Sequence, residues 1–104
     1  MKTEKLHLNN ASILEWVESN RETLNQLLYN NVFDFAKSDK LSFSMLRIYS
    51  FSDKDAFGTD IVVNLLITKY DLAETVDKLL RAYELDENYE RCAELLKLRN
   101  SLEN

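Results

Sequence analysis

The side chains that most often carry protein chemistry are scarce in this 104-residue chain, which holds one histidine and one cysteine. His7 lies near the N-terminus, where a side chain is seldom held rigidly, so we expect an exposed imidazole without a catalytic role. Cys92 lies on the apolar side of a helical pattern, between Tyr89 and Leu96, which indicates a buried, inert thiol rather than a nucleophile. No second histidine or cysteine completes a zinc site, and we expect neither a metal nor a cofactor.

A central polar segment has part of the pattern of a calcium-binding loop. Asp53 and Asp55 stand at its first and third positions, and Gly58 stands at the sixth. Phe57, however, occupies the place of the third side-chain oxygen, and Asn64 occupies the place of a bidentate glutamate. We therefore interpret the segment as a plain hairpin loop.

Carboxylates gather in a short stretch of the C-terminal third, which we call the acidic cluster: Glu84, Asp86, Glu87, Glu90 and Glu94. The last three are spaced by three and four residues and so share one helix face, where each like-charged pair costs a few tenths of a kcal/mol. One explanation is a solvated face near a helix N-terminus, where the helix dipole favours acids. The other is a docking surface for a basic protein partner, or an imitation of nucleic-acid phosphates.

The formal net charge of −5 is unevenly distributed along the chain. Residues 1–52 carry six acidic and six basic side chains, whereas residues 53–104 carry twelve and seven. Because an acidic surface repels phosphate backbones, we expect no direct binding of nucleic acid. The longest uncharged apolar run, residues 61–67, is too short to cross a bilayer, and the N-terminus lacks the apolar core of a signal peptide. We expect a cytoplasmic protein without membrane association, and the single cysteine agrees with a reducing compartment.

The side chains named above must be positioned by a few helices and strands. The first element that the sequence predicts is a helix over residues 12–36. Two capping-box patterns can start it, Ser12 with Glu15 and Ser19 with Glu22, so a split near residues 19–20 is expected. Apolar residues recur at helical spacing at Ile13, Val17, Leu24, Leu28, Val32 and Phe35.

Two central segments, residues 42–51 and 59–68, are rich in β-branched and aromatic residues and flank the polar loop. They predict an antiparallel hairpin, with Gly58 placed where a loop most often requires a positive φ. The residues of the first segment also fit a helical spacing, which leaves an all-α bundle as the alternative.

The last third of the chain predicts a helical hairpin. Asp71 and Glu74 form a variant capping box that opens an apolar stripe ending at Tyr83. The phase of the apolar pattern then changes between residues 84 and 88, which favours a turn with Asp86 or Asn88 as the new N-cap.

The final helix carries two apolar seams, and a small monomer can cover only one of them. We therefore expect homodimerisation or partner binding through a seam that includes Tyr89, Leu95, Leu98 and Leu102.

Together these patterns predict a single α+β domain over residues 1–104, with an N-terminal helix, a central antiparallel β-hairpin and a C-terminal helical hairpin. The absence of catalytic constellations favours a small acidic binding or regulatory protein that acts by protein–protein contact. Two alternatives stay open: an acidic nucleic-acid mimic of the kind used by phages and mobile elements, and a small enzyme that works with carboxylates and tyrosines.

Overall fold

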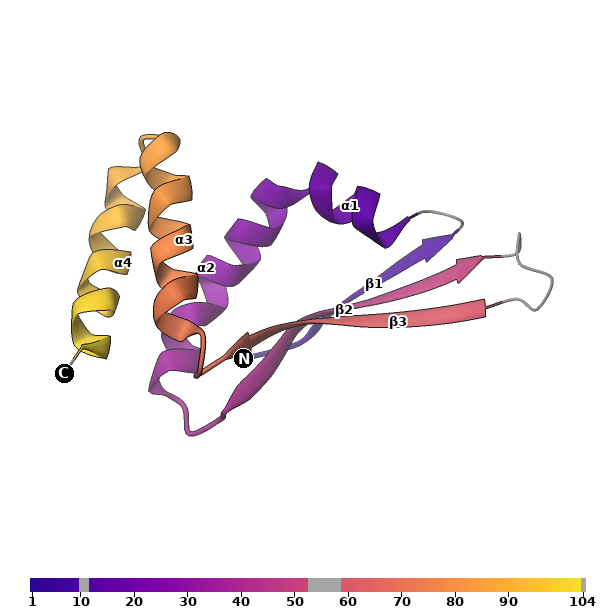
Figure 1. Cartoon of the computed structure of the whole chain (residues 1–104), viewed down its shortest axis with the longest axis horizontal. Coiled ribbons are helices and arrows are strands. Elements are labelled where there is room, and N and C mark those ends of the chain that lie inside the picture. The colour runs from indigo at the N-terminus through magenta and orange to yellow at the C-terminus, as the bar shows by residue number, and fades with distance from the viewer. Residues whose placement is uncertain (10–11, 53–58, 104) are drawn as a thin grey trace.

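The computed structural model describes residues 1–9, 12–52 and 59–103 and shows an α+β fold (Figure 1). The elements are β1 (Glu4–Asn9), α1 (Ile13–Ser19), α2 (Arg21–Lys37), β2 (Ser42–Ser52), β3 (Thr59–Thr68), α3 (Leu72–Leu85) and α4 (Tyr89–Leu102). The predicted fold class is therefore confirmed, and the all-α alternative is wrong because both central segments are strands.

The strands of the described residues form a mixed sheet in the order β1-β2-β3. β2 and β3 pair antiparallel from Ser42 opposite Thr68 to Ser52 opposite Thr59, with a bulge between Ser44 and Leu46, and this is the predicted hairpin. The predicted role of Gly58 and the comparison with a calcium loop fall on residues 53–58, outside the described residues.

β1 is a third strand that the sequence analysis did not assign. It pairs parallel with β2, from Glu4 opposite Leu46 to Asn9 opposite Phe51. A parallel pair needs a crossover connection, and here α1 and α2 provide it. The hairpin thereby gains the additional strand and the helical cover that two isolated strands require for stability in water.

The predicted split of the N-terminal helix is present, and it lies at Asn20. Ser12 caps α1, because its Oγ accepts a hydrogen bond from the backbone N–H of Glu15 at 3.3 Å. Asn20, not Ser19, is the boundary residue: its Nδ2 donates to the carbonyl of Trp16 at 2.8 Å, which satisfies one carbonyl at the end of α1.

The predicted turn between the last two helices is also present. Glu87 has a φ of 56°, which lets the chain reverse, and the N–H of Asn88 donates to the carbonyl of Tyr83 at 2.9 Å. The side chain of Asn88 accepts a hydrogen bond from the N–H of Arg91 at 3.4 Å and is the N-cap of α4. Asp71 precedes α3 as expected, but its carboxylate makes no capping bond there.

The core lies where α2 and α3 meet the near end of the hairpin, with α4 packed against α3 (Figure 1). Its buried members are Val32, Phe35, Phe43, Met45, Ile67, Leu72, Val76, Leu79, Tyr83 and Leu95. Lys69, directly after β3, ties the sheet to this core. Its Nζ donates to the carbonyls of Phe35 at 2.8 Å and Ala36 at 3.2 Å, and so satisfies the C-terminal end of α2.

The two faces of the sheet have different surroundings. Side chains alternate between faces along a strand, and directly paired residues share a face. Ile48, paired with Val63, is fully buried on the inner face, which the helices cover in Figure 1. Tyr49, paired with Val62, lies on the outer face, which no helix covers in the part of the chain that Figure 1 describes.

Candidate docking surface

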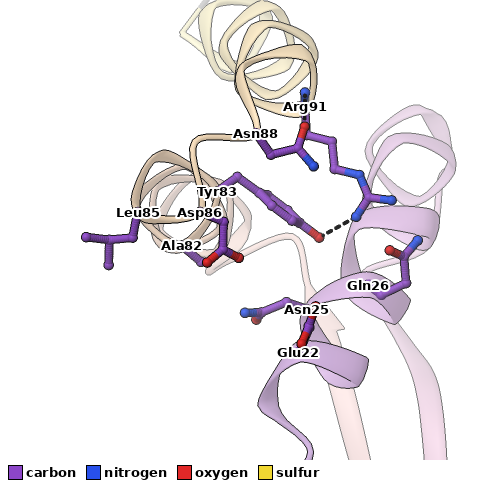
Figure 2. A pocket seen from close by; sticks show the side chains of 9 residues that line it. All are labelled: Glu22, Asn25, Gln26, Ala82, Tyr83, Leu85, Asp86, Asn88 and Arg91. Carbon is purple, nitrogen blue, oxygen red and sulfur yellow. Dashed lines mark hydrogen bonds between the residues drawn. The ribbon is translucent and has the colours of Figure 1, made fainter.

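An open cleft of about 700 Å³ lies between α2 and the turn that joins α3 to α4 (Figure 2). We call it the interhelical cleft. Its lining residues are Glu22, Asn25, Gln26, Ala82, Tyr83, Leu85, Asp86, Asn88 and Arg91. The lining thus combines one guanidinium, three side-chain amides and two carboxylates, groups that hydrogen-bond a polar or charged ligand.

Arg91 forms one wall of the cleft and is held by two tyrosines. Its Nη1 donates to the hydroxyl of Tyr83 at 2.9 Å (Figure 2). Its guanidinium carbon lies 4.6 Å from the ring centroid of Tyr29 and 5.1 Å from that of Tyr83, which are cation–π distances. Because Tyr29 belongs to α2 and Tyr83 to α3, this one side chain of α4 connects three helices.

A second hollow, of about 570 Å³, also has Arg91 in its lining. It is lined by Tyr29, Glu90, Arg91, Ala93 and Glu94. Arg91 therefore lines both hollows, and each has two carboxylates in its lining: Glu22 and Asp86 in the cleft, and Glu90 and Glu94 in the second hollow.

The structure divides the predicted acidic cluster into two groups. Asp86 lines the interhelical cleft and Glu90 and Glu94 line the second hollow, whereas Glu84 and Glu87 are exposed and line neither. Within the described residues, the ion pair made by the cluster joins Glu94 to Lys97 at 3.5 Å on the surface. Such exposed pairs contribute little, so the cluster keeps most of its negative field.

Glu22 is the carboxylate that the sequence analysis missed at this surface. It lies in the first turn of α2, about sixty residues before the acidic cluster, and there it fits the ordinary preference of acids for a helix N-terminus. Its place in the cleft depends on the packing of α2 against α3, and no local pattern signals that packing.

The predicted apolar seam of the last helix is divided between core and surface. Leu95 is fully buried, and Leu98 and Leu102 pack against the core. Tyr89 is 68% exposed, and two further apolar side chains at this end of the molecule are exposed with it, Leu85 at 86% and Leu96 at 52%. The apolar surface here is therefore made by Leu85, Tyr89 and Leu96.

The one histidine and the one cysteine of the sequence have different neighbours. The ring of His7 stacks on that of Tyr49, with centroids 4.8 Å apart, while the Sγ of Cys92 lies 3.9 Å from the carbonyl of Leu80. Burial, and then the negative charge of Glu84, raise the pKa of the Cys92 thiol. A raised pKa keeps the thiol protonated at neutral pH and makes it a poor nucleophile.

No known protein family matches this chain, and no similar protein is found among curated sequences or solved structures. The described ranges hold no group of three or more histidine, cysteine or acidic side chains arranged to bind a metal ion. Within the same ranges, no helix has the length and apolar character that crossing a membrane requires.

Proposed function

We propose that this protein acts by protein–protein binding, without catalysis, and that its acidic end docks a basic amphipathic segment of a partner. The observation that carries the proposal is the pair of hollows that share Arg91 in their lining, each lined by two carboxylates. A lysine or arginine side chain entering either hollow meets these carboxylates, while Arg91 is engaged by two tyrosine rings.

Exposed apolar side chains beside the acids favour an amphipathic partner. Leu85 and Tyr89 flank the turn between α3 and α4, and Leu85 points away from Arg91 in Figure 2. Aromatic and apolar anchors supply most of the affinity in protein interfaces, whereas charges supply orientation and speed of association. A partner helix or strand that alternates basic and apolar residues fits both requirements.

The test uses a defined probe, a synthetic amphipathic peptide of lysine and leucine, with heteronuclear NMR correlation spectra as the readout. Asn25, Gln26 and Asn88 carry side-chain amides in the lining of the interhelical cleft. We expect their amide signals to shift on titration with the peptide and to shift less as salt is added. A peptide in which glutamate replaces lysine is the control for charge.

A charge-reversal pair tests the acidic cluster directly. Glu90→Lys with Glu94→Lys reverses both carboxylates that line the second hollow and changes the net charge from −5 to −1, because each substitution adds two charges. Glu15→Lys with Glu18→Lys makes the same change on exposed positions of α1 and is the matched control. We expect the first pair to weaken peptide binding at least tenfold and the control pair to weaken it little. Equal losses would show that only net charge matters and would contradict the proposed docking site.

Affinity capture from the native host then identifies the partner. It also distinguishes docking of a basic protein segment from imitation of nucleic-acid phosphates. A partner retained by the control variant and lost with the charge-reversal variant uses the acidic cluster. If DNA or RNA competes with this protein for that partner, the cluster acts as an imitation of nucleic-acid phosphates; without such competition, it docks a basic protein segment.

A further inference from the structure

The outer edge of β3 is open in the structure. β3 is the last strand of the sheet order and pairs with β2 on one side only, within the described residues. Every second backbone N–H and C=O of such a strand points away from the sheet. Three of its apolar side chains are about half exposed: Ile61 at 50%, Val62 at 50% and Leu66 at 55%.

Most of this edge lacks the charges and prolines by which proteins usually protect an edge strand, since Asp60 is the one charged residue of β3. Residues 61–68 include no charged residue and no proline, over a length of roughly 26 Å at strand spacing. The opposite edge of the sheet, β1, carries Glu4, Lys5 and His7 in six residues. A long, apolar, uncharged edge is a surface that pairs with another strand.

Residues 61–67 of β3 have the same order of side-chain types, aliphatic on both sides of Asn64, in both directions. Ile61 mirrors Ile67, Val62 mirrors Leu66, and Val63 mirrors Leu65. Antiparallel pairing of two identical strands about a two-fold axis sets each residue opposite its mirror position. The pattern therefore sets aliphatic side chains opposite aliphatic side chains over residues 61–67, with Asn64 opposite Asn64 at the axis.

The same register is consistent with the two faces of the sheet. Val62, Asn64 and Leu66 share the outer face, and Val63 and Leu65 share the inner face. Residues opposite one another in an antiparallel pair lie on one face, so each copy would extend both faces of the other. Shifting the register by one residue would set outer-face positions opposite inner-face positions and lose this match.

Charge also favours this edge for contact between copies. Two chains of net charge −5 repel each other, and a contact between the acidic clusters of two copies would bring like charges together. Pairing along residues 61–67 sets no charged residue of one copy opposite a charged residue of the other. The contact thus avoids the like-charge repulsion that any acidic face would bring.

We propose that two copies of this chain pair antiparallel along β3, about a two-fold axis at Asn64, and join their three-stranded sheets into one continuous sheet. The dimer contact lies on the sheet and not on the last helix, so it leaves the acidic cluster of both copies accessible. This proposal does not depend on the proposed partner binding.

The first test is the mass in solution, measured by sedimentation. We expect the wild type to sediment at twice the 12.2 kDa of one chain. Val62→Lys and Leu66→Glu each place a charge on the half-exposed outer face of the edge, and each should shift the equilibrium toward the monomer because a charged side chain replaces an aliphatic contact with the residue opposite. Circular dichroism is the check that both variants remain folded. Asn64 is left intact because its Oδ1 accepts from Ser44 Oγ at 3.0 Å and Arg47 Nε at 2.9 Å.

A mixing experiment tests the register. In the proposed dimer Val62 of one copy faces Leu66 of the other, so Val62→Lys mixed with Leu66→Glu brings opposite charges together and should restore a mass of two chains. Val62→Lys mixed with Leu66→Lys brings like charges together and should stay monomeric. Leu96→Lys, on the exposed side of α4, is the control for a contact through the last helix and should remain dimeric.

Three results would overturn the proposal. The first is a monomeric wild type at micromolar concentration. The second is a dimer that Val62→Lys leaves intact or that Leu96→Lys dissociates, since the contact would then lie elsewhere. The third is a failure of the oppositely charged mixture to associate while both variants are folded, which would exclude the register about Asn64.

Discussion

At the helical end of the molecule, three helices bury apolar side chains between them, among them Phe35, Leu79 and Leu95. At the edge of β3, by contrast, the apolar side chains of Val62 and Leu66 are half exposed to water. The charges are distributed in the opposite way, because the acidic cluster lies on the helical end and residues 61–68 carry none. The helical end is therefore complete as a core and charged as a surface, whereas the sheet edge leaves apolar side chains and backbone groups without a partner strand in the described residues.

The largest effect on stability should come from removing a buried side chain from the helical core. Phe35→Ala removes a fully buried ring and should lower the free energy of unfolding by about 3–5 kcal/mol, measured by urea denaturation at fixed protein concentration. Phe51→Ala removes a ring of the same type from an exposed position in β2 and should cost about 1 kcal/mol or less. Comparable losses for the two variants would break the distinction between the two regions.

The next effect concerns the connection between sheet and helices. Lys69→Met keeps the aliphatic stem but removes the ammonium that lies 4.8 Å from the Phe35 ring and caps α2. Hydrogen bonds to a charged group suggest a loss of about 2 kcal/mol in the free energy of unfolding. Lys78→Met removes a lysine from an exposed ion pair and should change it by about 0.5 kcal/mol or less. If the two variants are equally stable, Lys69 does not hold the α2 terminus.

A smaller effect is expected at the docking surface. Arg91→Met removes the cation between two tyrosine rings and should cost about 1 kcal/mol of unfolding free energy. It should also raise hydrogen exchange in α4, because Arg91 connects that helix to α2. Arg81→Met, at an exposed position of α3, is the matched control. A variant of Arg91 with unchanged stability and exchange would show that the hollows are not held by this side chain.

The smallest effect is a dependence on pH. Burial and the charge of Glu84 raise the pKa of Cys92 in the folded chain. As the pH passes about 8.5, the ordinary cysteine pKa, the unfolded chain loses this proton first, so the folded state binds more protons and stability falls with rising pH. The fall in unfolding free energy should be shallower for Cys92→Ala than for the wild type. The opposite order of slopes would contradict a raised pKa.

Patterns between near neighbours in the sequence were predictable, and contacts between distant segments were not. The caps at Ser12 and Asn88 and the turn before α4 follow from side chains a few residues apart. β1 was missed because it offers only Leu6 and Leu8 as an apolar alternation, and its parallel partner lies beyond two helices.

The candidate site shows the same division. The residues of the acidic cluster lie within one short stretch of the sequence and could be recognised there, although Glu84 and Glu87 lie outside both hollows. The position of Arg91 between Tyr29 and Tyr83 depends on how three helices pack, and none of the local spacings predicts it. The two apolar seams of the last helix were recognised in the sequence. Which of them is buried depends on the side of α4 that packs against α3, and in the structure that side includes Leu95.

In the proposed dimer, apolar pairing at the sheet edge brings two copies together, while the acidic cluster acts at the helical end. The most direct measurement is sedimentation equilibrium of the wild type at about 50 mM and about 500 mM salt, over which screening shortens electrostatic range severalfold. We predict a dimer whose dissociation constant is unchanged or lower at high salt, since screening weakens the repulsion between two acidic chains. A dimer that weakens as salt is added, or a monomer at both concentrations, would contradict the account.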